Sequence, residues 1–160
     1  MADKSGNKVK LVVVTPYKVF FEEKVSSVTV PSLDGDYGIM AGHTPLVLAL
    51  KAGICSVRID KDYKYFTVSE GFAEIGQHLV LIVCNSAEWP EEITVKRLAD
   101  TLKETKEDES RILALEDSKA RKYAMKEVTQ RLNRINARID ILKKYGSDVQ
   151  KERLVSYGLV

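Results

Sequence analysis

The spacing of hydrophobic residues changes near Trp89, and this change divides the chain into two parts. Before that point, apolar residues gather in short runs rich in β-branched and aromatic side chains, which is typical of β-strands. The pattern predicts strands over Lys10–Thr15, Val25–Val30, Gly53–Ile59, Tyr63–Val68 and Leu79–Cys84. Many short strands separated by turn residues predict a sandwich or a flattened barrel.

Two of these runs lead to different predictions about burial. In Gly53–Ile59, the residues Cys55, Val57 and Ile59 alternate with polar residues, so we expect a strand with one face in water. The run Leu79–Cys84 is apolar at every position, which predicts a strand buried on both faces.

After Trp89 the pattern becomes helical, since no proline or glycine occurs between Ile93 and Tyr145. The second half of this stretch has a narrow apolar seam at three- and four-residue spacing: Met125, Val128, Leu132, Ile135, Ile139 and Leu142. The first half has a less regular seam: Ile93, Leu98, Leu102, Ile112, Leu113 and Leu115. We predict two antiparallel helices with a turn between Glu104 and Ser118, Ser118 as the cap of the second helix, and Gly146 as its end.

The predicted fold class is therefore α+β, with an antiparallel β-sandwich of residues 1–88 followed by a two-helix hairpin of residues 89–145. Residues 146–160 form a tail that contains Leu154, Val155, Tyr157, Leu159 and Val160. Because this tail is too apolar for a plain disordered end, we expect it to pack against the sandwich or a neighbouring protein.

Composition limits the possible functions. The 160 residues are 44% hydrophobic and 30% charged, and the net charge of +2 is too small to indicate binding to nucleic acid or to an acidic membrane.

Cys55 and Cys84 lie in apolar runs without further metal ligands nearby, so we expect reduced, buried thiols and no metal site. The N-terminus resembles no targeting peptide, and the longest apolar run, Leu79–Cys84, is far shorter than the roughly 20 residues of a membrane helix. We expect a soluble chain without direct membrane insertion.

The segment Val30–Val47, VPSLDGDYGIMAGHTPLV, is the first candidate site, and we call it the glycine-rich segment. Its three glycines predict a tight, shaped loop that leaves a sheet, and it carries Asp34, Asp36 and His43. Two plain alternatives remain open: Asp36 is a solvated acid in a turn, or His43 is hydrogen-bonded within its own loop and contacts no partner protein.

The second predicted helix is strongly basic, whereas the first is richer in acids. Arg131, Arg134 and Arg138 share one helical face, and we call them the arginine row; such a row can dock carboxylates or phosphates. The plain alternative is that the hairpin balances its own charges. A stand-alone nucleic-acid-binding module that uses this helix is the alternative function. An enzyme is disfavoured because no motif assigns a nucleophile, a phosphate loop or a metal site.

Ordered segments of the chain resemble the epsilon subunit of F-type ATP synthases, of the bacterial or plastid type. VVVTPYKVFFEEKVSSVTVPS is similar to the family's opening strands, and LDGDYGIMAGHTPLV to its glycine- and histidine-containing loop, with Ala41 at a position usually held by proline. SEGFAEI and VCNSAE resemble the strands before the helices, with Glu70 in place of a glycine. The resemblance implies about ten strands, a two-helix hairpin, and a non-catalytic subunit of the central stalk.

The family resemblance also implies partners and site residues. The subunit would bind gamma and the c-ring through the glycine-rich segment, at Asp36, Tyr37, Gly38, Gly42 and His43. Its helices would extend toward the alpha/beta catalytic head and inhibit ATP hydrolysis, with Arg131, Arg134 and Arg138 on the beta subunit. The implied location is peripheral, on the cytoplasmic face of the bacterial inner membrane.

Some members of this family bind one regulatory ATP in the folded hairpin. Carried over to this chain, the corresponding residues are Glu88, Arg97, Arg134 and Arg138. The chain departs from the family pattern at two neighbouring positions, because Thr94 replaces an acid and Leu98 replaces an alanine. Apart from this ATP, no cofactor is expected.

Overall fold

Contacts divide the chain into two compact units, one that ends at Trp89 and one that spans Pro90–Val160. The structure is a computed structural model and describes residues 7–160. The first six residues, which belong to the predicted domain 1–88, lie outside the described part.

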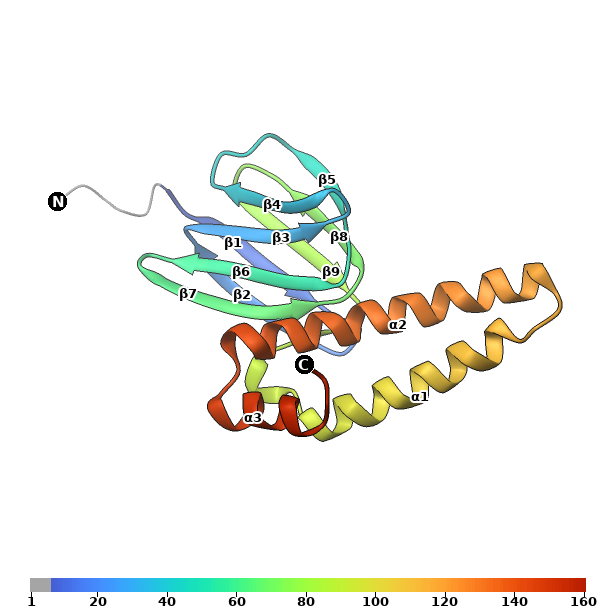
Figure 1. The fold of residues 1–160 in the computed structure, drawn as a ribbon. Coiled ribbons are helices and arrows are strands. Elements are labelled where there is room, and N and C mark those ends of the chain that lie inside the picture. The colour runs from blue at the N-terminus through green and yellow to red at the C-terminus, as the bar shows by residue number, and fades with distance from the viewer. Residues whose placement is uncertain (1–6) are drawn as a thin grey trace. The chain divides into compact units, whose positions relative to one another are not determined.

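The first unit is a β-structure. Its strands are β1 (Val9–Val14), β2 (Val19–Val25), β3 (Ser27–Ser32), β4 (Gly35–Met40), β5 (Leu46–Leu50), β6 (Gly53–Ile59), β7 (Asp62–Val68), β8 (Gly71–Ile75), β9 (Leu79–Cys84) and β10 (Ala87–Glu88). Hydrogen bonding orders them β10-β7-β6-β3-β5-β8-β9-β1-β2, with β4 paired to β3 (Figure 1).

The strand β3 makes the corner between the two layers of the sandwich. Its first half pairs with β6, Val28 opposite Val57, while Ser32 at its end pairs with Leu50 of β5. All strand pairs are antiparallel except β1 with β9, where Leu11 lies beside Val80 in parallel register. The predicted antiparallel sandwich is thus confirmed, with one parallel pair inside it.

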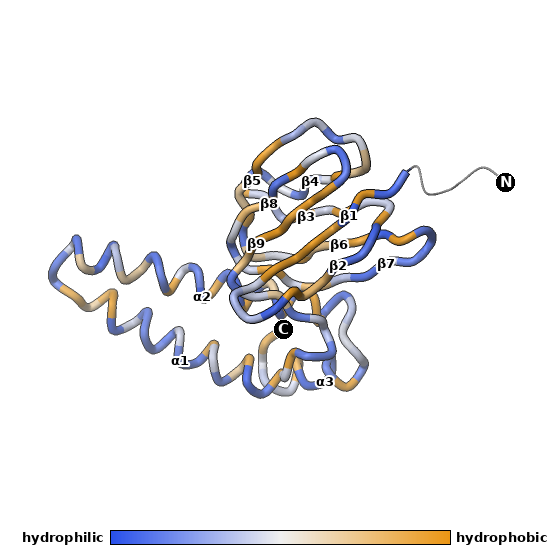
Figure 2. The backbone as a smooth tube through the Cα atoms, turned by 180° about the vertical axis from the view of Figure 1, so that it is seen from behind, coloured by the Kyte–Doolittle hydropathy of each residue, from blue (hydrophilic) through white to orange (hydrophobic). Residues whose placement is uncertain are grey.

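Side chains from alternate strand positions fill the interior of the sandwich. Figure 2 shows the resulting apolar stretches along β1 and β9. One end of this core is aromatic: Trp89 stacks on Phe20 at a ring distance of 5.0 Å and meets Phe66 edge-on at 5.3 Å. These contacts explain why the first unit includes Trp89, one residue past the predicted boundary at residue 88.

Burial along the strands confirms one prediction and overturns another. In β6, Cys55 and Val57 are buried while Ser56 and Arg58 are half-exposed, so the predicted alternation is correct up to Arg58; Ile59, at the end of the strand, is only half-buried. In β9, however, only Val80, Ile82 and Cys84 are buried, and the strand is not buried on both faces. The prediction failed because apolar residues also occupy the outer face of this strand, where an unbroken apolar run no longer indicates full burial.

Hydrophobic spacing missed β2, β4, β5, β8 and β10 as separate strands, whereas the family resemblance implied about ten strands, with one at SEGFAEI. β8 is marked by Gly71, which pairs with Cys84 of β9. A side chain at Gly71 would overlap the carbonyl oxygen of Val83, so glycine is needed there for close approach of the two strands.

The second unit is helical. A short 3-10 turn, η2 (Pro90–Glu92), leads into α1 (Val95–Leu113), which is followed by α2 (Ser118–Tyr145) and α3 (Asp148–Ser156). α1 and α2 form the predicted antiparallel hairpin, with the turn at residues 114–117.

The caps of α2 differ in part from the sequence-based expectation. Asp117, not Ser118, is the N-cap, because its carboxylate accepts hydrogen bonds from the backbone N–H groups of Lys119 and Ala120. Gly146 ends the helix as predicted. Its φ of −69° is open to any residue, but a Cβ there would lie 2.5 Å from the Leu142 oxygen, so the glycine allows close approach.

The apolar seams of the hairpin are uneven. Val128, Ile135, Ile139 and Leu142 of the predicted α2 seam are buried, as expected. The predicted α1 seam is wrong at its end, because Leu113 is 57% exposed and Leu115 is 42% exposed. These two residues lie at the tip of the hairpin, at the end of α1 and in the turn that follows it.

The tail folds as the helix α3 and packs within its own helical unit, whereas the sequence-based prediction was packing against the sandwich or a neighbouring protein. Ser147 and Gln150 form a capping box at its start, and its buried residue is Leu154. α3 contacts α1 and α2, so the tail packs within its own helical unit. The helical unit therefore contains a third helix beyond the two that the sequence predicted.

Candidate functional site

The glycine-rich segment is mostly a β-hairpin and not the loop that its glycines predicted. β3 and β4 run antiparallel from Ser27 opposite Met40 to Ser32 opposite Gly35, so only the turns at residues 33–34 and 41–45 lie outside strands. Gly35 adopts a φ of +121°, which L-residues rarely adopt. The Ser32 hydroxyl donates to the Gly35 carbonyl at 2.5 Å and closes the first turn.

Pleating divides the predicted contact residues into two sets. Along β4, Asp36 and Gly38 point to the opposite face from Tyr37 and Ile39. Asp36 and Gly38 are exposed, whereas Ile39 is fully buried. A Cβ on Gly38 would find no atom closer than the Thr29 hydroxyl oxygen at 4.0 Å. Gly38 is therefore exposed and without close contacts on the outer face of β4.

Tyr37 and His43 hold the second turn together. The Nδ1 atom of His43 lies 2.6 Å from the Thr44 carbonyl oxygen, and its Nε2 atom lies 3.0 Å from the Tyr37 hydroxyl. A carbonyl oxygen only accepts, so Nδ1 carries the proton, and in the neutral ring Nε2 accepts from the tyrosine. The two rings also meet edge-on at 5.7 Å.

Gly42 completes this turn with a φ of +81° and an N–H bond of 2.9 Å to the Gln77 carbonyl. The structure thus brings Tyr37, Gly42 and His43 together in one fixed turn. Exposed apolar side chains lie around it: Met40 is 62% exposed and Val47 is 68% exposed. Fixed geometry with exposed apolar and acidic groups suits a contact surface and offers no reactive group.

The arginine row lies on α2, and its first member is already engaged within the helical unit. Arg131 donates to Asp108 of α1 at 2.7 Å, and Arg111 also pairs with Asp108. Both guanidinium groups lower the pKa of the Asp108 carboxyl, with the Arg131 hydrogen bond as the largest cause. For Arg131, the plain alternative of internally balanced charge describes the structure.

Arg134 and Arg138 are half-buried on the same helix. Of the other residues in the predicted ATP set, Arg97 is exposed on α1, and Glu88 is half-buried in β10. Glu88 belongs to the first unit and the three arginines to the second.

Among residues 7–160, no group of three or more metal-ligating side chains lies together, and no helix is long and apolar enough to cross a membrane. Cys55 and Cys84 are free and buried, as predicted. Burial raises the pKa of both thiols, that of Cys84 to about 11.

Comparison with known proteins identifies the family. The sequence profile described as "ATP synthase, Delta/Epsilon chain, beta-sandwich domain" matches residues 8–90. The ATP synthase epsilon chain of Prochlorococcus marinus is 35% identical over 129 residues, which cover 81% of this chain and 96% of that one. The chain belongs to the ATP synthase epsilon chain family.

Other relatives of this epsilon-type chain lie in different lineages. The epsilon chain of Alkaliphilus metalliredigens is 34% identical over 102 residues, covering 64% of this chain and 76% of its own length. The chloroplastic epsilon chain of Tupiella akineta is 28% identical over 123 residues, covering 77% and 95%. The family resemblance drawn from the ordered motifs is therefore confirmed.

A chain in the Euglena gracilis mitochondrial ATP synthase, in a structure described as OSCP/F1/c-ring, has the same fold. Its TM-score is 0.68 at 23% identity, with 84% of this chain and 81% of that chain covered. At this identity the likeness supports the architecture alone.

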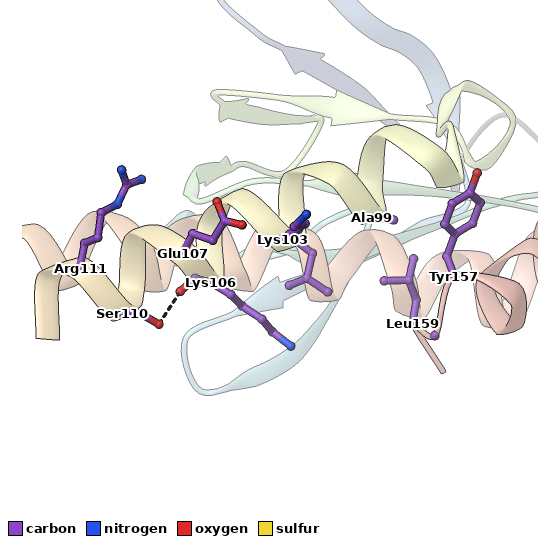
Figure 3. A pocket seen from close by; sticks show the side chains of 10 residues that line it. Ala99, Lys103, Lys106, Glu107, Ser110, Arg111, Tyr157 and Leu159 are labelled. Atoms are coloured by element: carbon purple, nitrogen blue, oxygen red, sulfur yellow. Dashed lines mark hydrogen bonds between the residues drawn. The ribbon is translucent and has the colours of Figure 1, made fainter.

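Sequence reasoning missed one surface feature of this epsilon-type chain. A groove of about 700 Å³ lies between α1 and the residues after α3, lined among others by Ala99, Lys103, Arg111 and Leu159 (Figure 3). The apolar composition of the tail was the available signal, but it gave no indication of which surface the tail would contact.

Proposed function

We propose that this epsilon-type chain is a non-catalytic subunit of the ATP synthase central stalk that joins gamma to the c-ring. The observation that carries the proposal is the fixed turn of the glycine-rich segment, in a chain whose family membership is established. The turn exposes Gly42, and the adjoining strand β4 exposes Asp36 and Gly38, where a Cβ would meet only the Thr29 hydroxyl at 4.0 Å. Exposed glycines permit close backbone approach by a partner, and Asp36 offers charge to basic loops.

His43 and Tyr37 act as positioning residues for this contact. We expect His43→Phe to lower the affinity for a purified gamma–c-ring complex about tenfold, because it removes two hydrogen bonds that each contribute about 0.5–1.5 kcal/mol. The affinity is measured by surface-immobilised binding.

His78 provides a matched control, since it is the other histidine of the chain and lies exposed in the turn between β8 and β9. We expect His78→Phe to bind like the unaltered chain. Equal affinities for all three proteins would remove the glycine-rich segment from the interface.

We propose in addition that the helical unit inhibits ATP hydrolysis through the arginine row. Arg131, Arg134 and Arg138 fit an acidic segment of the beta subunit in the alpha/beta head by charge. Asp108 now holds Arg131, so docking of this residue requires exchange of one carboxylate partner for another. Hydrolysis assays with Arg134→Ala and Arg138→Ala test this contact, and unchanged inhibition would exclude it.

A regulatory ATP on Glu88, Arg97, Arg134 and Arg138 also remains a proposal. The arginines suit phosphate groups, while Thr94 and Leu98 depart from the family pattern for the adenosine part. Equilibrium dialysis with ATP tests it, and absence of uptake would exclude the site. We further propose a peripheral position on the cytoplasmic face of the bacterial inner membrane, held by these protein contacts.

A further inference from the structure

The short helix α3 connects two parts of the helical unit that are far apart in the sequence. The side-chain amide of Gln150 donates from Nε2 to the Pro90 carbonyl at 2.8 Å and to the Ile93 carbonyl at 3.1 Å. Pro90 and Ile93 belong to the segment that leads into α1, whereas α3 directly follows α2. One side chain therefore joins the beginning of α1 to the end of α2.

The orientation of this amide is fixed from its other side as well. Its oxygen, Oε1, accepts the backbone N–H of Ser147 at 2.9 Å, and the Ser147 hydroxyl in turn accepts from the Gln150 N–H at 3.2 Å. The capping box thus directs the oxygen of Gln150 toward its own helix and the NH₂ group toward the Pro90–Ile93 segment.

Apolar contacts strengthen the same connection. Leu154 is 1% exposed, on a helix that contacts both α1 and α2. After α3, Gly158 adopts a φ of +66°. The Gly158 N–H donates to the Val155 carbonyl and the Leu159 N–H to the Leu154 carbonyl, which is the pattern of a Schellman motif. This turn places Leu159 beside Ala99 of α1, in the groove shown in Figure 3.

The opposite end of the hairpin is packed more loosely. Leu113 and Leu115 are exposed there, and Tyr123 near the start of α2 is 82% exposed. Nearer its middle, the ion pair of Arg131 with Asp108 joins the two helices, and each side chain is 31% exposed. The Gln150 hydrogen bonds, the buried Leu154 and the turn at Gly158 thus gather at the open end of the hairpin, where α3 lies.

We propose that α3 is a clasp that holds the two helices of the hairpin together, so that α1 and α2 separate only after α3 detaches. The clasp consists of the Gln150 amide, Leu154 and the turn at Gly158. Its regulatory consequence rests on the proposed function: release of α3 would free the helices for their inhibitory contact with the catalytic head.

Gln150→Glu tests the clasp while it preserves the cap. A carboxylate oxygen still accepts the Ser147 N–H, but the second oxygen replaces the NH₂ donor and faces two carbonyl oxygens. Lys151→Gln is the matched control, because it changes the net charge by the same amount at an exposed position of the same helix.

The measurement is amide hydrogen exchange of the full chain. We expect Gln150→Glu to speed exchange at Ile93, Leu98 and Gly146 at least tenfold, and to leave Leu115 and Arg121 at the tip unchanged. Lys151→Gln should match the unaltered chain. Faster exchange confined to α3 itself, or none at all, would overturn the clasp.

A second variant and a second assay keep the two proposals separate. Leu154→Ala should give the same exchange pattern as Gln150→Glu, since it removes the apolar part of the clasp. In hydrolysis assays with a purified catalytic core, both variants should inhibit more strongly than the unaltered chain. If exchange accelerates but no chain affects hydrolysis, the proposed function fails and the clasp stands; if exchange is unchanged, the clasp fails whatever hydrolysis does.

Discussion

His43 illustrates how single residues give the glycine-rich segment its shape. Both of its ring nitrogens are engaged, one by the Thr44 carbonyl and one by the Tyr37 hydroxyl, so hydrogen bonds fix the orientation of the ring and the path of the turn. Gly42 then supplies the left-handed backbone position that the turn requires. The surface offered to a partner is consequently formed before binding, which lowers the ordering cost of association.

Cys55 and Cys84 are buried structural residues, and their burial predicts that the stability of the chain depends on pH. The folded chain keeps the Cys84 proton up to a pKa of about 11, whereas the unfolded chain releases it near the ordinary value of about 8.5. The contribution of this thiol to stability is therefore complete below about pH 8.5, falls by up to about 1.4 kcal/mol per pH unit between that value and about pH 11, and changes no further above it.

Urea unfolding between pH 7 and the alkaline range measures this effect. The free energy of unfolding should fall more steeply with pH in the unaltered chain than in Cys84→Ala, because only the unaltered chain has this thiol. Lysine and tyrosine titrate in both proteins, so their contribution cancels in the comparison. Parallel pH profiles for the two chains would show that burial does not control this thiol.

Among the elements, the helices show what hydrophobic spacing predicts and where it stops. The seam from Val128 to Leu142 indicated α2 correctly, because a helix with one buried face has few other apolar positions. The end of α1 was misread, since apolar residues in a turn carry no periodicity that reveals their exposure. α3 was missed because its nine residues contain only one buried side chain, Leu154.

The strands show the same limit. β6 and β9 were predicted within their observed bounds from β-branched, apolar runs. β4, with the sequence GDYGIM, reads as a loop because glycine is unfavourable in strands, yet full pairing with β3 overrides that preference. The pairing of Tyr37 with His43 and of Arg131 with Asp108 depends on distances that no spacing rule contains.

The N-cap of α2 contributes to the stability of the helical unit, and this contribution can be measured by substitution. Asp117→Ala should lower the free energy of unfolding of the helical unit by about 1 kcal/mol, because two N–H groups lose their acceptor. Ser118→Ala, the residue next to it, should leave stability nearly unchanged. Thermal unfolding followed by far-ultraviolet circular dichroism measures both, and a larger loss of stability for Ser118→Ala than for Asp117→Ala would place the cap at Ser118.

For the whole molecule, the two units divide the proposed work. The sandwich carries a rigid contact surface whose geometry is fixed by strand pairing and one histidine. The helical unit carries charge that is partly neutralised internally, by Asp108, and a clasp at its open end. Neither unit needs a reactive group for these roles, which agrees with a family of stalk subunits and with the buried, protonated state of both thiols.

The rate of ATP hydrolysis reports directly on the proposed inhibitory role. The assay uses a purified ATP synthase catalytic core that lacks its own epsilon subunit, with and without this chain. We expect the chain to bind the core and to lower the rate severalfold, with a smaller decrease for the Arg134→Ala, Arg138→Ala double variant. Binding of the chain without any change in the rate would contradict this role.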